Sequence, residues 1–160
     1  MTEQESTTQR QYLDHYRTTF ERTCEGLTLE QLATRSVPPS TMSLLGLVRH
    51  LAKVEHQWFR RTLGRQEDLP ALYREAEDPD HDFEGAVGTD ACVAEAWESW
   101  RREVAHAREV HARYDDPGQP FIPGEPWKVR GVVFHMIEEY ARHCGHADLL
   151  RERIDGRVGQ

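Results

Sequence analysis

The sequence WKVRGVVFHMIEEYARHCGHADLLRERIDG, residues 127–156, predicts one long helix with two distinct faces. Apolar side chains recur along it at helical spacing and predict a stripe that faces a core. At about 100° per residue, a second set of side chains falls within roughly 80° of arc beside that stripe. This set consists of His135, Glu139, His143 and His146. Groups that can bind a metal therefore lie next to the buried face of this helix rather than on its solvent-exposed back.

Three more segments show the apolar periodicity of long amphipathic helices, and they cover residues 6–25, 42–63 and 91–114. Ser40 or Thr41 is the expected N-cap of the second segment, and Asp90 that of the third. Thr28 and Gln31 have the form of a capping box, which predicts a short helical turn at 28–34. Together these elements predict an all-α fold, a four-helix bundle with long crossover connections, formed by a single domain over 1–160.

Two long connections separate the helices. Residues 65–90 are acidic and lose the periodicity, and at most one helical turn is expected there, at 69–76. Residues 115–127 contain four prolines and predict a stiff, extended loop. Connections of this length suit a crossover between helices or a lid over a site.

The composition excludes several classes of partner. The net charge is −8 and no basic run offsets it, which argues against nucleic-acid or anionic-membrane binding. No apolar run approaches the roughly 20 residues that span a bilayer, and the N-terminus lacks the apolar core of a signal peptide. The three widely spaced cysteines indicate no disulfide framework, which fits a reducing cytoplasm. We expect a cytoplasmic protein, and its bundle shape leaves a homodimer open.

Glu139 and His143 are the strongest candidate metal ligands in the sequence. They lie one turn apart on one helix face, a spacing that a single ion can bridge. Imidazole and carboxylate groups suit zinc, nickel or iron rather than calcium. The same pattern also occurs in polar seams and in hydrogen-bonded core histidines, so the spacing alone leaves that reading open.

A third ligand must come from another helix. His50 is the best candidate, because it borders the apolar face of the second long segment, whereas His56 is expected to point towards water. His111, on the apolar seam of the third segment, is the rival. Glu55 lies inside an apolar arc, so we expect it to be the buried partner of an arginine, a tyrosine or a ligand histidine. Cys144 is expected to be an inert buried thiol.

Two blocks of the chain resemble the DinB-like superfamily of four-helix bundles, which includes DinB, YfiT and mycothiol-dependent maleylpyruvate isomerase. They are LLGLVRHLAKVEHQWF at 44–59 and HMIEEYARHCGHADLLRERIDG at 135–156. The order of the helices agrees as well, so the resemblance covers nearly the whole chain. It points in particular to the actinobacterial branch related to the mycothiol-dependent isomerase, and it implies a divalent metal, with zinc or nickel favoured.

The resemblance also implies specific ligands. The family's metal histidine of the second long helix falls on His50, and its i,i+4 pair in the last helix falls on Glu139 and His143. Many relatives have histidine at the position of Glu139, but the mycothiol-dependent branch resembles this chain in having Glu-x-x-x-His. Many relatives also carry glutamine at the position of His146. Whether His146 supports a ligand, acts as a general base or replaces a ligand is therefore left open.

The function that the resemblance implies is thiol chemistry at an open metal site. A low-molecular-weight thiol such as mycothiol would attack an electrophilic small molecule, which makes the protein a transferase or isomerase. His146 or Glu55 would then orient a ligand or move a proton. Two alternatives stay open: a non-catalytic, stress-related bundle in which the ion staples helices together, and a metal-dependent hydrolase that uses bound water.

Overall fold

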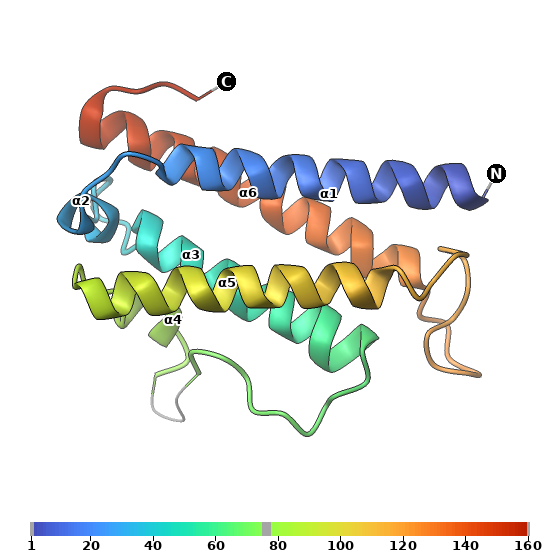
Figure 1. Cartoon of the computed structure of the whole chain (residues 1–160). Coiled ribbons are helices and arrows are strands. Elements are labelled where there is room, and N and C mark those ends of the chain that lie inside the picture. Colours follow the sequence, from blue (N-terminus) through green and yellow to red (C-terminus); the bar gives the residue numbers. More distant parts are fainter. Residues whose placement is uncertain (1, 75–77, 160) are drawn as a thin grey trace.

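The computed structural model describes residues 2–74 and 78–159. Four long helical segments lie alongside one another (Figure 1), and they are α1 (Thr2–Cys24), α3 (Leu44–Glu55) continued by the π-helix η1 (His56–Leu63), α5 (Asp90–His111) and α6 (Val129–Asp155). Two short helices lie in the connections, α2 (Leu29–Ala33) and α4 (His81–Glu84). Within the described ranges there is no strand, only an isolated bridge between Pro120 and Lys128. The predicted all-α bundle is confirmed.

The helices pack as two pairs around a shared core. α1 lies along α6, α3 packs against α5, and α3 also contacts α6 (Figure 1). Phe20, Leu47, Phe59 and Met136, which come from three of the four long segments, are completely buried. Each such side chain contributes about 1.5–3 kcal/mol relative to exposure. The amphipathic stripes of the sequence therefore meet in one common core, which fixes α3 against α6.

The helix ends follow local capping chemistry, with two corrections to the predicted caps. The capping box of Thr28 is confirmed, since its side chain accepts from the Gln31 amide and the Gln31 side chain accepts from the Thr28 amide. The N-caps of α3 and α5 are Ser43 and Thr89, not the expected Ser40 or Thr41 and Asp90. Each true N-cap has extended backbone angles and a hydroxyl that accepts a helix amide, whereas Asp90 already belongs to the helix.

The segment formed by α3 and η1 is buried on more than one side. α5, α6 and α4 all pack against α3, so it has no single solvent-exposed back. His56, which was expected to face water, is only 5% exposed. Its Nδ1 lies 3.3 Å from a carboxylate oxygen of Glu103, and its Nε2 lies 3.0 Å from the carbonyl oxygen of Pro70. The prediction for His56 was wrong because it assumed one buried face for a helix that is covered by neighbours on several sides.

The long acidic connection is fastened to α3 through α4. The helical turn predicted at 69–76 is absent from 69–74, and residues 75 and 76 lie outside the described part of the chain. Helix α4 forms further on, and the buried Arg49 of α3 donates to the carbonyl oxygens of His81 and Asp82, both at 2.9 Å. These charge-assisted bonds hold the middle of the connection beside His50.

A buried ion pair ties the two helix pairs together. Arg17 of α1 donates to both carboxylate oxygens of Glu55, each at 2.8 Å, and neither side chain is appreciably exposed. The hydroxyl of Tyr140 donates to Glu55 at 2.8 Å and accepts from the indole of Trp100 at 2.9 Å. One connected set of bonds therefore links α1, the end of α3, α5 and α6.

No helix in the described ranges is long and apolar enough to cross a membrane.

Candidate metal centre

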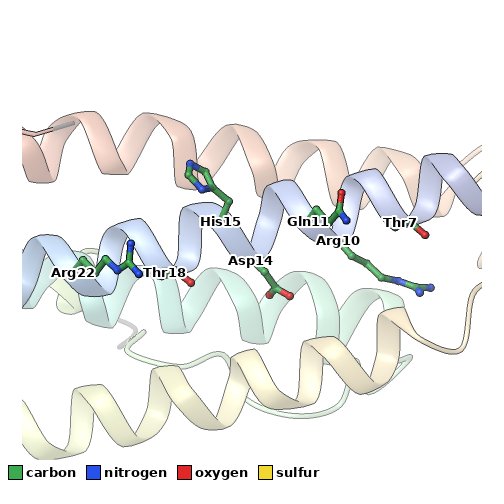
Figure 2. Close-up of a pocket in the computed structure, with 7 residues that line it drawn as sticks. All are labelled: Thr7, Arg10, Gln11, Asp14, His15, Thr18 and Arg22. Carbon is green, nitrogen blue, oxygen red and sulfur yellow. The ribbon is translucent and has the colours of Figure 1, made fainter.

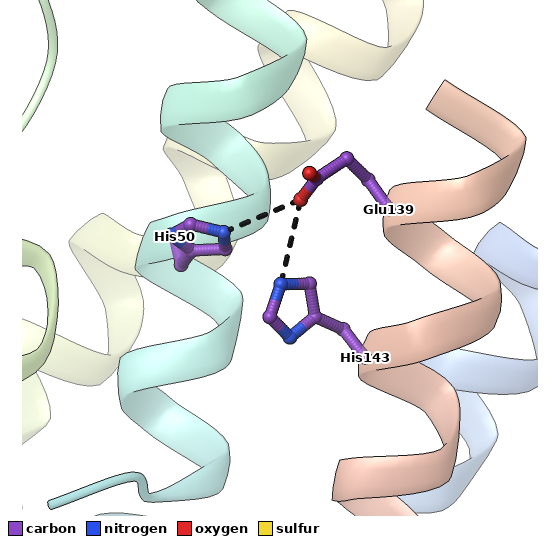
Figure 3. A group of neighbouring side chains, drawn as sticks. All are labelled: His50, Glu139 and His143. Carbon is purple, nitrogen blue, oxygen red and sulfur yellow. Dashed lines mark ion pairs between the residues drawn. The ribbon is translucent and has the colours of Figure 1, made fainter. Parts of the chain in front are cut away.

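Three predicted ligands meet where α3 faces α6. Figure 3 shows His50 reaching from α3 towards Glu139 and His143, which lie one turn apart on α6. Glu139 Oε2 lies 3.6 Å from His50 Nε2 and 3.4 Å from His143 Nε2. One ligand atom from each residue lies within 4.8 Å of the other two, a spacing that could hold a metal ion. Two imidazoles and a carboxylate are a donor set typical of zinc or nickel.

His50 is held on its far side by the connection. Its Nδ1 lies 2.9 Å from Oδ2 of Asp82, and its ring stacks on Phe83 with centroids 5.1 Å apart. Its Nε2 is buried and has no hydrogen-bond partner, because 3.6 Å to Glu139 is longer than a hydrogen bond. Burial disfavours the charged imidazole, but the carboxylates of Asp82 and Glu139 outweigh it and raise the pKa of His50. A buried nitrogen that makes no hydrogen bond and faces a carboxylate is consistent with a cation between them.

Glu139 is surrounded by imidazoles. Its Oε2 faces His50 and His143, while its Oε1 lies 3.7 Å from Nε2 of His135. The His135 ring in turn packs against Trp58, with centroids 4.5 Å apart. The interaction with His50, assisted by the other two histidines, lowers the pKa of Glu139 despite its partial burial. The carboxylate is therefore ionised at neutral pH and supplies the negative charge of the cluster.

His143 presents its two nitrogens to different partners. Nε2 faces Glu139, and Nδ1 lies 3.2 Å from Nδ1 of His146. Burial, together with the nearby His50, lowers the pKa of His143 to about 4. At neutral pH this imidazole is therefore uncharged, as a metal ligand must be. His146 lies beside His143 but does not belong to the group of three whose ligand atoms converge.

The other candidates from the sequence lie elsewhere. The rival ligand His111 packs against Phe59 (ring centroids 6.1 Å apart), and its Nε2 is buried without a hydrogen-bond partner. Of the three partners expected for Glu55, the structure supplies an arginine and a tyrosine, which engage both of its oxygens. Burial raises the pKa of the Cys144 thiol to about 12, so this cysteine stays protonated.

The cluster opens into a pocket of about 460 Å³. Its walls combine ligand candidates, the end of α4 and the segment before α3, and they comprise Thr41, Met42, His50, Asp80, Phe83, Glu139, Arg142, His143 and His146. Another hollow, of about 570 Å³, runs along the outer face of α1 (Figure 2). All of its lining residues belong to that one helix, and none is a candidate ligand. Only the first of these two pockets combines space for a small molecule with converging ligand atoms.

Asp82 and Phe83 are the parts of this site that the sequence did not reveal. They lie more than 30 positions from His50, in a connection without periodicity, and no motif marks them. The acidic composition of that connection spreads over many residues and does not single out Asp82. Only the attachment of α4 to α3 brings the two residues against the His50 ring.

Comparison with known proteins gives one family. Neither the search of curated proteins nor the search of solved structures finds a match. A family model described as mycothiol-S-transferase matches residues 8–156, which include all four long helical segments almost in full and every candidate ligand. The chain therefore belongs to the mycothiol-S-transferase family.

Proposed function

We propose that this protein is a divalent-metal-dependent transferase or isomerase that uses a low-molecular-weight thiol such as mycothiol and holds the cation with His50, Glu139 and His143. The observation that carries the proposal is the convergence of these three groups at the wall of a small-molecule pocket. Membership of the mycothiol-S-transferase family supports the choice of thiol. We infer that the second substrate is an electrophilic small molecule.

The residues fit a divalent cation in kind and in placement. The Nε2 atom of His50 is buried and makes no hydrogen bond. The neutral imidazole of His143 and the ionised carboxylate of Glu139 are in the protonation states that a ligand needs. When bound, a divalent cation lowers the pKa of a coordinated thiol, so that a thiolate is available near neutral pH.

The remaining groups of the pocket orient ligands and substrates. If His143 carries its proton on Nδ1, it donates a hydrogen bond to Nδ1 of His146. The lone pair on Nε2 of His143, on the side that faces Glu139, is then available to bind a metal ion. Arg142, exposed at the rim, and Asp80 offer polar contacts to a hydroxyl-rich thiol. Phe83 and Met42 supply the apolar part of the same wall. This mixture suits a polar small molecule that must be held with its sulfur near the ligand group.

The open pocket favours an enzyme over a structural staple. A structural zinc is usually closed by four protein ligands, whereas a catalytic ion keeps an open position beside three. Three donors converge here, and His146 faces His143 rather than the centre of the group. An ion that only joined α3 to α6 would need neither the open position nor the adjoining pocket.

Two measurements test the proposal. Protein produced without a histidine tag is analysed for bound metal, and its conjugation of mycothiol to a chloro-substituted fluorogenic bimane is followed as the S–C bond forms and chloride leaves. Replacing a direct ligand in His143→Ala or Glu139→Gln should lower kcat/KM by more than about 100-fold, since even groups behind a ligand cost 10–100-fold. His15→Ala, an exposed histidine on α1, is the matched control and should keep the wild-type rate.

The possible outcomes separate the candidate functions. If metal-free and metal-loaded protein conjugate the thiol equally fast, or if the ligand variants keep both metal and rate, the proposal is refuted. If the protein binds zinc tightly and becomes more stable but conjugates no thiol, the staple function is favoured instead.

A further inference from the structure

We propose that Asp82 is a positioning residue for the metal centre: its carboxylate holds His50 in the Nδ1–H tautomer and so points the Nε2 lone pair at the ligand group. The inference rests on the proposed function, which supplies the cation that accepts this lone pair. The juxtaposition itself, an aspartate from the crossover connection behind a histidine of α3, is a property of the fold.

The geometry of the contact between Asp82 and His50 fixes the tautomer. Oδ2 of Asp82 lies 2.9 Å from Nδ1 of His50, a normal hydrogen-bond length, and the aspartate side chain is almost completely buried. A carboxylate only accepts, so the imidazole must donate from Nδ1. In a neutral imidazole the other nitrogen then carries the lone pair, and that nitrogen faces Glu139. A carboxylate behind a ligand histidine commonly fixes the tautomer and raises the basicity of the ligand in this way.

Asp82 is itself held in place by its neighbours. Its backbone carbonyl accepts from Arg49, and Lys53 donates to Oδ2 at 3.2 Å. The neighbouring Phe83 ring stacks on the imidazole and restricts its rotation. The position of the Asp82 carboxylate relative to α3 is therefore fixed by several independent bonds.

The bond to His50 is specific to Asp82 within the connection. Asp80 and Glu84 flank Asp82, but both are exposed, and Glu84 pairs with Arg35 at the surface. Of the three acidic side chains, Asp82 alone forms a hydrogen bond with a candidate ligand in the described structure. Through it, α4 becomes part of the metal centre although it supplies no ligand. Displacing α4 would release the His50 ring.

The test compares Asp82→Ala and Asp82→Asn with Glu84→Gln, which removes the same charge from the same short helix without touching His50. The first readout is zinc affinity, measured by competition with a chromogenic chelator. We expect Asp82→Ala to weaken zinc binding by about 10–100-fold and Asp82→Asn by less, because an amide oxygen can still accept. Glu84→Gln should stay within about twofold of the wild type, as expected of an exposed charge.

The second readout is the tautomer of His50 in metal-free protein, from nitrogen-15 chemical shifts at alkaline pH. Wild type should show the Nδ1–H form, and Asp82→Ala should shift towards Nε2–H. Circular dichroism confirms that each variant is folded, and Asp82→Asn provides the test if Asp82→Ala does not fold. Wild-type zinc affinity together with an unchanged tautomer in a folded Asp82 variant overturns the inference. If wild type binds no divalent metal, the proposed function fails, while the tautomer still decides the role of Asp82.

Discussion

Replacing Glu55 with methionine should destabilise the protein strongly, because it leaves the Arg17 guanidinium buried without its main counter-charge. The two side chains are 4% and 0% exposed, and they are joined by two parallel bonds of 2.8 Å. Methionine has a similar volume, so the change creates little cavity and mainly removes charge and acceptors. The interpretation of Glu55 as a structural partner rather than a metal-site group depends on this result.

The magnitude follows from the partners that Arg17 keeps. Removing one member of a buried ion pair typically costs about 3–5 kcal/mol. Asp14 still accepts from Arg17 at 3.1 Å, but its side chain is 44% exposed, so it replaces the lost charge only in part. Tyr140 also loses an acceptor for its hydroxyl. We therefore expect the free energy of unfolding to fall by about 3 kcal/mol or somewhat more, which lowers the Tm by roughly 6–12 °C in a domain of this size.

The assay is urea unfolding of metal-free protein at neutral pH, with the midpoint and slope compared between variants. Arg17→Met and the double variant Arg17→Met/Glu55→Met complete a double-mutant cycle. The double variant should cost much less than the sum of the two single changes, since a buried pair can be exchanged for apolar groups at little net cost. A loss below about 1 kcal/mol for Glu55→Met, the range of exposed pairs, would refute the reasoning, and so would additivity in the cycle.

Four further outcomes are expected. Thr28→Ala removes the hydroxyl that accepts from the Gln31 amide, while the backbone amide of residue 28 can still donate to the Gln31 side chain, and it should lower the free energy of unfolding by about 1 kcal/mol, measured by urea unfolding. Burial and nearby arginines lower the pKa of His111 to about 4, whereas the same histidine in the unfolded chain has an ordinary pKa of about 6.5. The unfolded chain therefore binds more protons between these values, so the free energy of unfolding should fall as the pH drops from about 6.5 to about 4. His111→Phe should flatten that pH dependence. For Glu103, burial would raise the pKa, but its partners His56 and Arg60 outweigh burial and hold the pKa at about 2. The stability that this carboxylate provides should be lost as the pH falls from its ordinary pKa of about 4.5 towards 2, and Glu103→Gln should remove that part of the acid dependence. Zinc at about 100 times its Kd should stabilise the protein by about 2.7 kcal/mol and raise the Tm by roughly 5–10 °C, and His143→Ala should show no such rise in a thermal melt.

Much of the fold could be predicted from periodicity, because the spacing of apolar residues along a long amphipathic helix shows which face is buried. The stripe beside His143 placed the last helix, and the capping box at Thr28 placed a short one. The i,i+4 spacing put Glu139 and His143 on one face without any knowledge of the other helices. The boundaries were less accurate, because a cap depends on backbone angles that composition does not show, as Ser43 and Thr89 illustrate.

The environment of α3 could not be predicted in the same way. Its burial depends on how many neighbours cover it, and a helix in contact with three others buries polar groups that a single-stripe reading assigns to solvent. His56 was misplaced for this reason. The pairing of Glu55 with Arg17, 38 positions apart, likewise depends on the packing of α1 against the bundle.

The sequence by itself determined that four long helices form, that two ligand candidates share a turn of α6, and that His50 was the best candidate for a partner across the interface. These are properties of spacing along one helix or of its apolar face. Only the tertiary structure decided that Nε2 of His50 meets Glu139, that His111 lies apart, and that Asp82 stands behind the His50 ring. Those relations join residues that are far apart in the chain, and they exist because α3 packs between α6 and the connection that carries α4.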